Sequence, residues 1–142
     1  MLKQLSFPSP DKKQKVVLSH LGEIQPDYGY YSLAISGLSN LFENRVFGRP
    51  CMWSPESRFL AVQEWKETVE GNPPKFYILL IIDVMTRREC VISNVEGTKG
   101  NILPEGFIGE SLMYTVIYYG PFGITRNFES KFQYLDGWQN LK

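Results

Sequence analysis

Six consecutive apolar residues, from Tyr77 to Ile82, constrain the fold more than any other stretch of the chain. The run lies between Asn72-Pro73-Pro74 and Asp83, and such flanks mark the limits of an element. Six residues are too few to cross a bilayer, and their length and β-branching indicate a strand. A strand without a polar face has to be covered on both sides. The sequence therefore predicts a strand over residues 75–83 in a fold with more than one layer.

The rest of the chain also favours strands. Aromatic residues make up 14% of the 142 residues, and aromatic side chains are enriched on pleated, half-buried surfaces. Short runs with β-branched or alternating residues alternate with turn signals, and helix signals are weak. We expect strands at 15–20, 28–36, 58–65, 88–93, 112–119 and 125–134. The sequence thus predicts an all-β, antiparallel fold of about eight to ten strands.

One short phrase recurs along the chain. Ser9-Pro10-Asp11 follows Phe7, and Ser54-Pro55-Glu56 follows Trp53, while residues 103–106 read Leu-Pro-Glu-Gly. Proline fixes its own φ and favours an extended residue before it, so each copy predicts a turn that leads into a strand. We expect Asp11 to accept backbone amides in its turn. The spacing indicates three β-meander units, at about 5–47, 50–95 and 100–138, within a single domain of residues 1–142.

The second unit resembles one blade of a β-propeller of the TolB-like and WD-repeat-like type. The resemblance is clearest over residues 51–92, in C-M-W-S-P-E-S-R-F-L-A-V and I-L-L-I-I-D-V-M-T-R-R-E. Glu56 and Ser57 stand where Asp and Gly are usual, and Arg87 stands where Gly follows Thr. The resemblance implies a binding scaffold without catalytic residues. Because propellers have four to eight blades, we expect three units to form a compact sandwich or partial barrel, or several chains to complete a ring.

Charge and composition argue against several classes of partner. Fifteen basic residues balance fifteen acidic ones, so no overall field attracts nucleic acid or an anionic membrane. The first residues lack the apolar core of a signal peptide, and Cys51 and Cys90 form no paired motif. We expect a soluble, cytoplasmic protein that binds neither nucleic acid nor membrane.

No pattern in the chain indicates catalysis. His20 is the single histidine, which argues against a catalytic zinc site or a histidine-based triad. Cys51 and Cys90 lie in apolar, strand-like contexts that are typical of small buried side chains. Phosphate-binding loops, nucleophile elbows and EF-hand loops are absent from the sequence. We therefore predict no catalytic residue, no metal and no cofactor.

Two sets of residues are candidates for binding. Aromatic residues at loop–strand junctions can serve as recognition anchors or as core packing. In this set Tyr28 and Tyr30 should share one strand face and Tyr31 the other. The aromatic candidates are Tyr28, Tyr30, Tyr31, Tyr118, Tyr119 and Phe122. The second set is an acidic rim in predicted loops, comprising Glu64, Glu67 and Glu70 with Glu23 and Asp27.

These observations support three hypotheses about function. The first is a small β-scaffold that binds another protein or its own copies, in one version an inhibitor or immunity-type protein. The second is a hydrolase that uses Glu64, Glu67 and Glu23, because paired carboxylates can perform acid–base chemistry. The third is a structural subunit whose strand edges join copies into a ring. A flat aromatic patch favours the first, a cleft with two converging carboxylates the second, and apolar edges the third.

Overall fold

A computed structural model describes residues 4–25, 28–38, 41–68 and 72–141. All the strands in these ranges pair antiparallel, and no α-helix lies in them. The prediction of an all-β antiparallel fold is confirmed. The strands are β1 (Gln4–Pro8), β2 (Lys15–Gln25), β3 (Tyr28–Ile35), β4 (Val46–Trp53), β5 (Phe59–Lys66), β6 (Phe76–Asp83), β7 (Arg88–Glu96), β8 (Gly100–Ile108), β9 (Ser111–Tyr118), β10 (Thr125–Lys131) and β11 (Gln139–Asn140), with a 3-10 turn η1 (Phe132–Tyr134).

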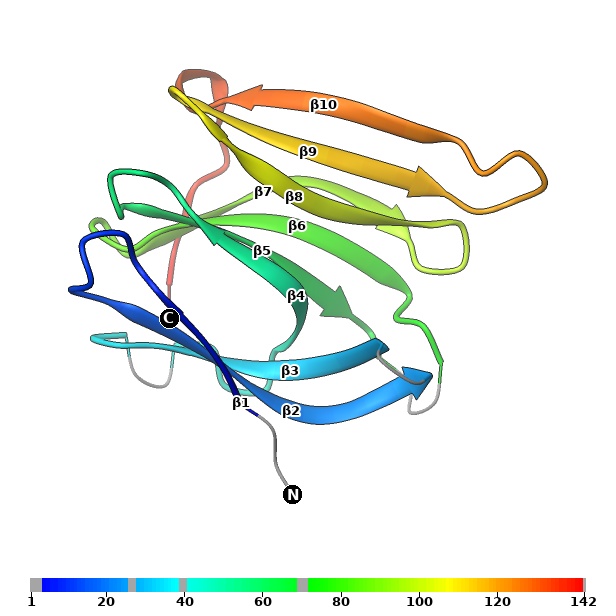
Figure 1. The fold of residues 1–142 in the computed structure, drawn as a ribbon, viewed down its shortest axis with the longest axis horizontal. Coiled ribbons are helices and arrows are strands. Elements are labelled where there is room, and N and C mark those ends of the chain that lie inside the picture. Colours follow the sequence, from blue (N-terminus) through cyan, green and yellow to red (C-terminus); the bar gives the residue numbers. More distant parts are fainter. Residues whose placement is uncertain (1–3, 26–27, 39–40, 69–71, 142) are drawn as a thin grey trace.

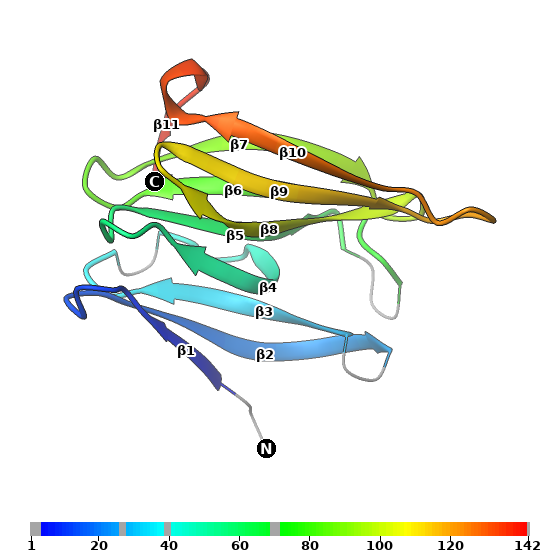
Figure 2. The same ribbon diagram turned by 45° about the horizontal axis from the view of Figure 1, so that its top comes forward.

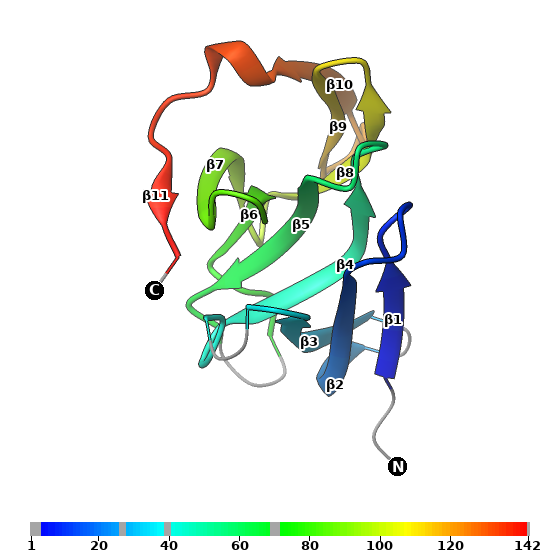
Figure 3. The same ribbon diagram turned by 90° about the vertical axis from the view of Figure 1, so that its left-hand side faces the viewer.

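The strands form two sheets. The larger has the order β1-β2-β3-β4-β5-β6-β7-β11, and the smaller has the order β10-β9-β8 (Figure 1). The large sheet is strongly curved, and the small sheet lies over its β4–β7 half (Figure 3). After η1 the chain returns to the large sheet, where β11 pairs with β7 through Gln139 and Asn140.

The resemblance to a β-propeller is wrong. A propeller blade is a separate four-stranded sheet set around a central channel. Here the first two predicted units share one continuous sheet, and neither sheet closes on itself. Within the described residues, the two units join where β3 pairs with β4 at Tyr31 and Phe47. The blade-like sequence over 51–92 therefore describes hairpins inside a larger meander.

The repeated Ser-Pro phrase forms two matching hairpin turns. Ser9 and Ser54 are both buried, and their hydroxyls accept the backbone amides of Gln14 at 3.1 Å and Phe59 at 2.9 Å. In each turn the residue three positions after the serine has a positive φ, 62° at Lys12 and 63° at Ser57. The same residue types thus build the same turn twice, as the sequence predicts.

The two turns also lie against each other. The backbone amide of Asp11 donates to Ser57 Oγ at 2.9 Å, and Trp53 Nε1 donates to the carbonyl of Phe7 at 2.9 Å. Asp11 itself accepts the backbone amide of Lys13 at 2.9 Å, which confirms its predicted role. Hydrogen bonds between segments more than forty residues apart thus join the β1–β2 turn to the β4–β5 turn.

The third copy of the phrase does not form a turn. Residues 103–106 lie inside β8, where the register with β9 shifts between Pro104 and Gly106. Proline is tolerated there because β8 is the edge strand of the small sheet and a bulge removes the need for its amide. The leucine in place of serine also removes the hydroxyl that closes the other two turns.

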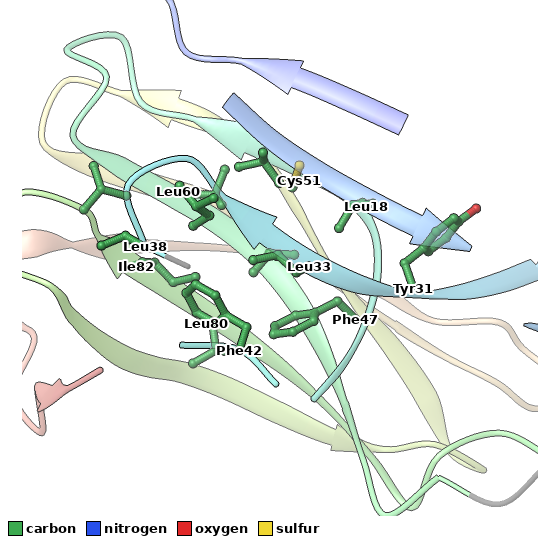
Figure 4. Packing of buried hydrophobic residues seen from close by; sticks show 14 residues of the cluster. Leu18, Tyr31, Leu33, Leu38, Phe42, Phe47, Cys51, Leu60, Leu80 and Ile82 are labelled. Carbon is green, nitrogen blue, oxygen red and sulfur yellow. The ribbon is translucent and has the colours of Figure 1, made fainter. Parts of the chain in front are cut away.

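Two hydrophobic clusters hold the fold, and β5 and β6 contribute to both. The first lies inside the curve of the large sheet and includes Leu18, Leu33, Phe47, Leu60 and Ile82 (Figure 4). The second, between the two sheets, includes Trp65, Tyr77, Leu79, Ile102 and Leu112. Neighbouring residues of β6 thus face different clusters, which confirms that this strand is covered on both sides.

Candidate binding surface

The β9–β10 hairpin projects beyond the rest of the molecule (Figures 1 and 2). Its strands pair without irregularity from Ser111–Lys131 to Ile117–Thr125. The loop over residues 119–124 is closed by the amide of Tyr118, which donates to the carbonyl of Ile124 at 2.7 Å. Gly120 and Gly123 have φ values of 135° and 53° there, which glycine adopts without strain. The tip is therefore a defined turn on a regular two-stranded arm.

The tip carries large apolar side chains that the described part of the chain leaves exposed. Phe122 is 89% exposed, Tyr119 52%, Ile124 50% and Tyr118 39%, and residues 118–124 include no charged residue. Single exposed apolar residues are normal, but a continuous apolar patch marks an interaction site. Of the eight predicted binding residues, Tyr118, Tyr119 and Phe122 lie together on this patch.

A buried polar network lies at the base of the hairpin. The Tyr28 hydroxyl lies 2.6 Å from the Tyr77 hydroxyl and accepts Asn101 Nδ2 at 2.9 Å. Gln63 donates to Asn101 Oδ1 and, at 2.8 Å, to the carbonyl of Ile102. These bonds connect β3, β5 and β6 of the large sheet with β8 of the small sheet. The network thereby fixes the sheet that carries the hairpin.

Burial keeps the hydroxyls of this network protonated. It raises the pKa of Tyr77 to about 12. Burial also raises the pKa of Tyr28, and hydrogen bonds with the hydroxyls of Tyr77 and Tyr119 raise it further.

The other three predicted tyrosines lie elsewhere. Tyr31 is buried in the first cluster, where its ring meets the edge of His20. Tyr28 and Tyr30 are half-buried and pack against Trp65, each with ring centroids 5.5 Å apart. The alternation of faces is confirmed, since Tyr31 points to one cluster and Tyr28 and Tyr30 to the other. The six aromatic candidates therefore do not form a single surface.

The prediction that Glu64 belongs to an acidic rim in a loop is wrong. This residue lies in β5, is 2% exposed, and accepts Arg45 Nε at 2.8 Å and Lys66 Nζ at 3.2 Å. Glu67 is exposed, and its carboxylate lies 3.9 Å from Lys75 Nζ. Glu23 lies 3.3 Å from His20 Nε2, and the predicted members Glu70 and Asp27 fall outside the described residues. The predicted strand over 58–65 already includes Glu64, and its position in β5 agrees with that strand rather than with the acidic loop.

Arg45 is the centre of a charged group that the sequence analysis missed. It pairs with Glu64 and, at 2.7 Å, with Glu89. Burial alone would lower the pKa of Arg45, but the two carboxylates raise it above its usual value. A cavity of about 480 Å³ beside this group is lined by Arg45, Glu64, Lys66 and Glu89 and lies under the segment around Gly137. Asp136 also lines this cavity. Glu64 and Glu89 are both held by Arg45, so neither is a free general base.

The described residues also bear on metal binding, membrane crossing and thiol chemistry. Across the described ranges, no three His, Cys, Asp or Glu side chains are arranged to hold a metal ion. No helix among those same residues is long and apolar enough to cross a bilayer. Cys51 and Cys90 are buried free thiols, and burial raises the pKa of Cys51 to about 12. Such a thiol stays protonated and is a poor nucleophile.

Comparison of the chain with protein-family models, with curated proteins and with solved structures finds no match. No relative therefore supports the propeller resemblance or supplies an activity. The function has to be argued from the surface of the chain itself.

Proposed function

We propose that the chain is a protein-binding module that docks through the tip of its β9–β10 hairpin. One observation carries this proposal: an uncharged loop on a projecting arm exposes Tyr118, Tyr119, Phe122 and Ile124 to solvent. Water solvates such a patch poorly, and burying apolar surface is worth roughly 25 cal/mol per Å². A partner protein that covers the tip gains this free energy.

The chemistry of the tip supports a protein as the partner. Tyrosine and phenylalanine are enriched at the centres of protein interfaces, because each buries a large area and fixes few torsions. The regular β9–β10 pairing holds the tip in place, so little entropy is lost on binding. A narrow arm suits insertion into a cleft, which is the geometry that an inhibitor or immunity-type protein needs. That role requires no catalytic residue.

The hydrolase hypothesis has less support. Of its three carboxylates, Glu64 lines the charged cavity, whereas Glu67 lies near Lys75 and Glu23 lies near His20. A glycosidase-type pair needs two carboxylates on either side of one bond. Glu89 and Asp136 line the same cavity as Glu64, but Arg45 holds Glu64 and Glu89, so the binding module remains the proposal.

A capture experiment with a matched control tests the proposal. Immobilised wild type, Phe122→Asp and Met85→Asp are each incubated with extract, and the retained proteins are quantified. Met85 is 72% exposed on the β6–β7 turn, so this control adds the same charge at another highly exposed apolar site. We expect proteins that wild type and Met85→Asp retain and Phe122→Asp loses. Identical retention by all three chains, or binding of wild type to phosphatidylcholine vesicles instead, contradicts a protein-binding tip.

A further inference from the structure

Strand β10 presents the longest regular open edge among the described strands. It pairs with β9 on one side, and six of its seven residues are exposed. Natural edges are usually shortened or interrupted by proline or bulges. That holds for the other edges, because β1 has five residues ending in Pro8, β8 contains Pro104 and a bulge, and β11 has two residues. Strand β10 contains no proline and no register shift.

The direction of its backbone groups follows from two hydrogen bonds at its ends. The carbonyl of Ile124 accepts from Tyr118 at 2.7 Å, and the amide of Phe132 donates to Glu110 at 2.9 Å. The backbone groups of Ile124 and Phe132 thus point toward β9. In an antiparallel strand the direction of these groups alternates from one residue to the next. Even-numbered residues of β10 therefore bond to β9. The amides and carbonyls of Thr125, Asn127, Glu129 and Lys131 point to the open edge.

We propose that a second copy of this chain pairs antiparallel with β10 along this edge and forms a sheet that continues through both copies. The proposal rests on the proposed function, since it names the partner of the same hairpin. A two-fold axis perpendicular to the sheet relates the copies and passes beside Phe128. The cross-strand pairs are then Thr125–Lys131, Asn127–Glu129, Arg126–Ser130 and Phe128–Phe128.

This register satisfies the backbone and the charges together. All four outward-pointing residues face outward-pointing residues of the second copy, which gives about eight new backbone hydrogen bonds. Glu129 meets Asn127 of the second copy instead of another carboxylate. Moving the axis by one residue toward the C-terminus would place Glu129 against Glu129, and like charges directly opposite are unfavourable. Moving it the other way would pair Lys131 with Gly123, at the turn, and lose part of the ladder.

The same register accounts for exposed apolar residues along the strand. Phe128, which is 38% exposed and stacks on Tyr114 of its own chain, meets its copy at the centre. Continuing the pairing outward by one position brings Ile124, which is 50% exposed, toward Phe132 of the second copy, where η1 begins. Pairing of two copies therefore covers apolar side chains that are exposed in one.

Light scattering of the purified chain over a wide range of concentrations tests self-pairing. We expect the mass to rise from 16.4 kDa toward twice that value. Asn127→Pro removes an outward-pointing amide and leaves the bonds to β9 in place, so it should keep its circular dichroism spectrum and stay monomeric. A wild-type chain that is monomeric throughout, or an Asn127→Pro chain that still dimerises, overturns the proposal.

A charge exchange tests the register without disturbing the edge. Asn127→Asp keeps the acceptor for Thr115 Oγ1, which donates to Asn127 Oδ1 at 3.0 Å. It also places a carboxylate opposite Glu129 at both symmetry-related contacts of the dimer, so the dissociation constant of the dimer should rise about tenfold. Adding Glu129→Lys turns both contacts into opposite-charge pairs and should restore dimerisation. If the double variant is as weak as Asn127→Asp alone, the register centred on Phe128 is wrong.

The outcomes separate this inference from the proposed function. A monomeric wild type whose Phe122→Asp variant still loses captured proteins overturns self-pairing and leaves the binding tip intact. A dimer that Asn127→Pro dissociates, with unchanged capture by Phe122→Asp, supports self-pairing and contradicts the docking of other proteins at the tip.

Discussion

Replacing Gln63 with leucine tests whether the buried network holds the two sheets together. Gln63 is 2% exposed, accepts Trp65 Nε1 at 2.7 Å and donates to the carbonyl of Ile102 at 2.8 Å. Leucine has a similar volume but leaves both groups buried without a partner. Each such loss costs about 1–3 kcal/mol, and the added apolar contact offsets about 1 kcal/mol. We expect Gln63→Leu to lower the free energy of unfolding by about 3 kcal/mol.

The matched control is Gln14→Leu, the same chemical change at a different site. The amide oxygen of Gln14 is buried and has no hydrogen-bond partner in the described part of the chain. Leucine there removes an unsatisfied group, so stability should change by less than about 0.5 kcal/mol or increase. Urea unfolding followed by tryptophan fluorescence measures both variants. A loss below about 1 kcal/mol for Gln63→Leu, or equal losses for the two variants, would refute the role of the network.

Three further changes test the ion pairs and the repeated turn by chemical or thermal denaturation. Arg45→Met leaves Glu64 buried with one cation fewer and should cost about 3–5 kcal/mol, and a loss under about 1 kcal/mol contradicts this. Asp83 is buried, which alone would raise its pKa, but its hydrogen bonds lower it; stability should therefore fall as the pH drops below about 4. Asp83→Asn should make stability depend less on pH in this range, and an unchanged loss of stability in acid would contradict this role of Asp83. Ser54→Ala leaves the Phe59 amide unpaired and should cost about 1–2 kcal/mol, whereas a neutral result removes the hydroxyl from the turn.

The strands that could be predicted are those with a clear local pattern. The alternation over 28–36 and the apolar run over 75–83 correspond to β3 and β6, and the repeated serine turn has the predicted form. Strands β4 and β8 were missed because Gly48 and Pro50 interrupt one and Pro104 the other. A bulge in each accommodates these residues. Whether such a segment forms a strand depends on its pairing partner, which is distant in sequence.

The candidate site could be predicted only in part, for the same reason. The position of Phe122 in a Gly-Pro loop indicates exposure, and the structure places it on the tip. Glu64 and Arg45 are 19 residues apart in sequence, and the pairing of β4 with β5 brings them together. The open edge of β10 also depends on the sheet order, because nothing local shows that no strand follows it.

Amide hydrogen exchange along β10 tests most directly the claim that the β9–β10 hairpin is the docking surface. The amides of Arg126 and Phe128 bond to β9 and should exchange slowly under all conditions. The amides of Asn127 and Glu129 point to the open edge, and we predict fast exchange in dilute solution. Their exchange should slow, together with that of the 119–124 loop, when the concentration rises or a captured partner is added. If these amides exchange at one rate at every concentration and with every retained protein, the hairpin is not a docking surface.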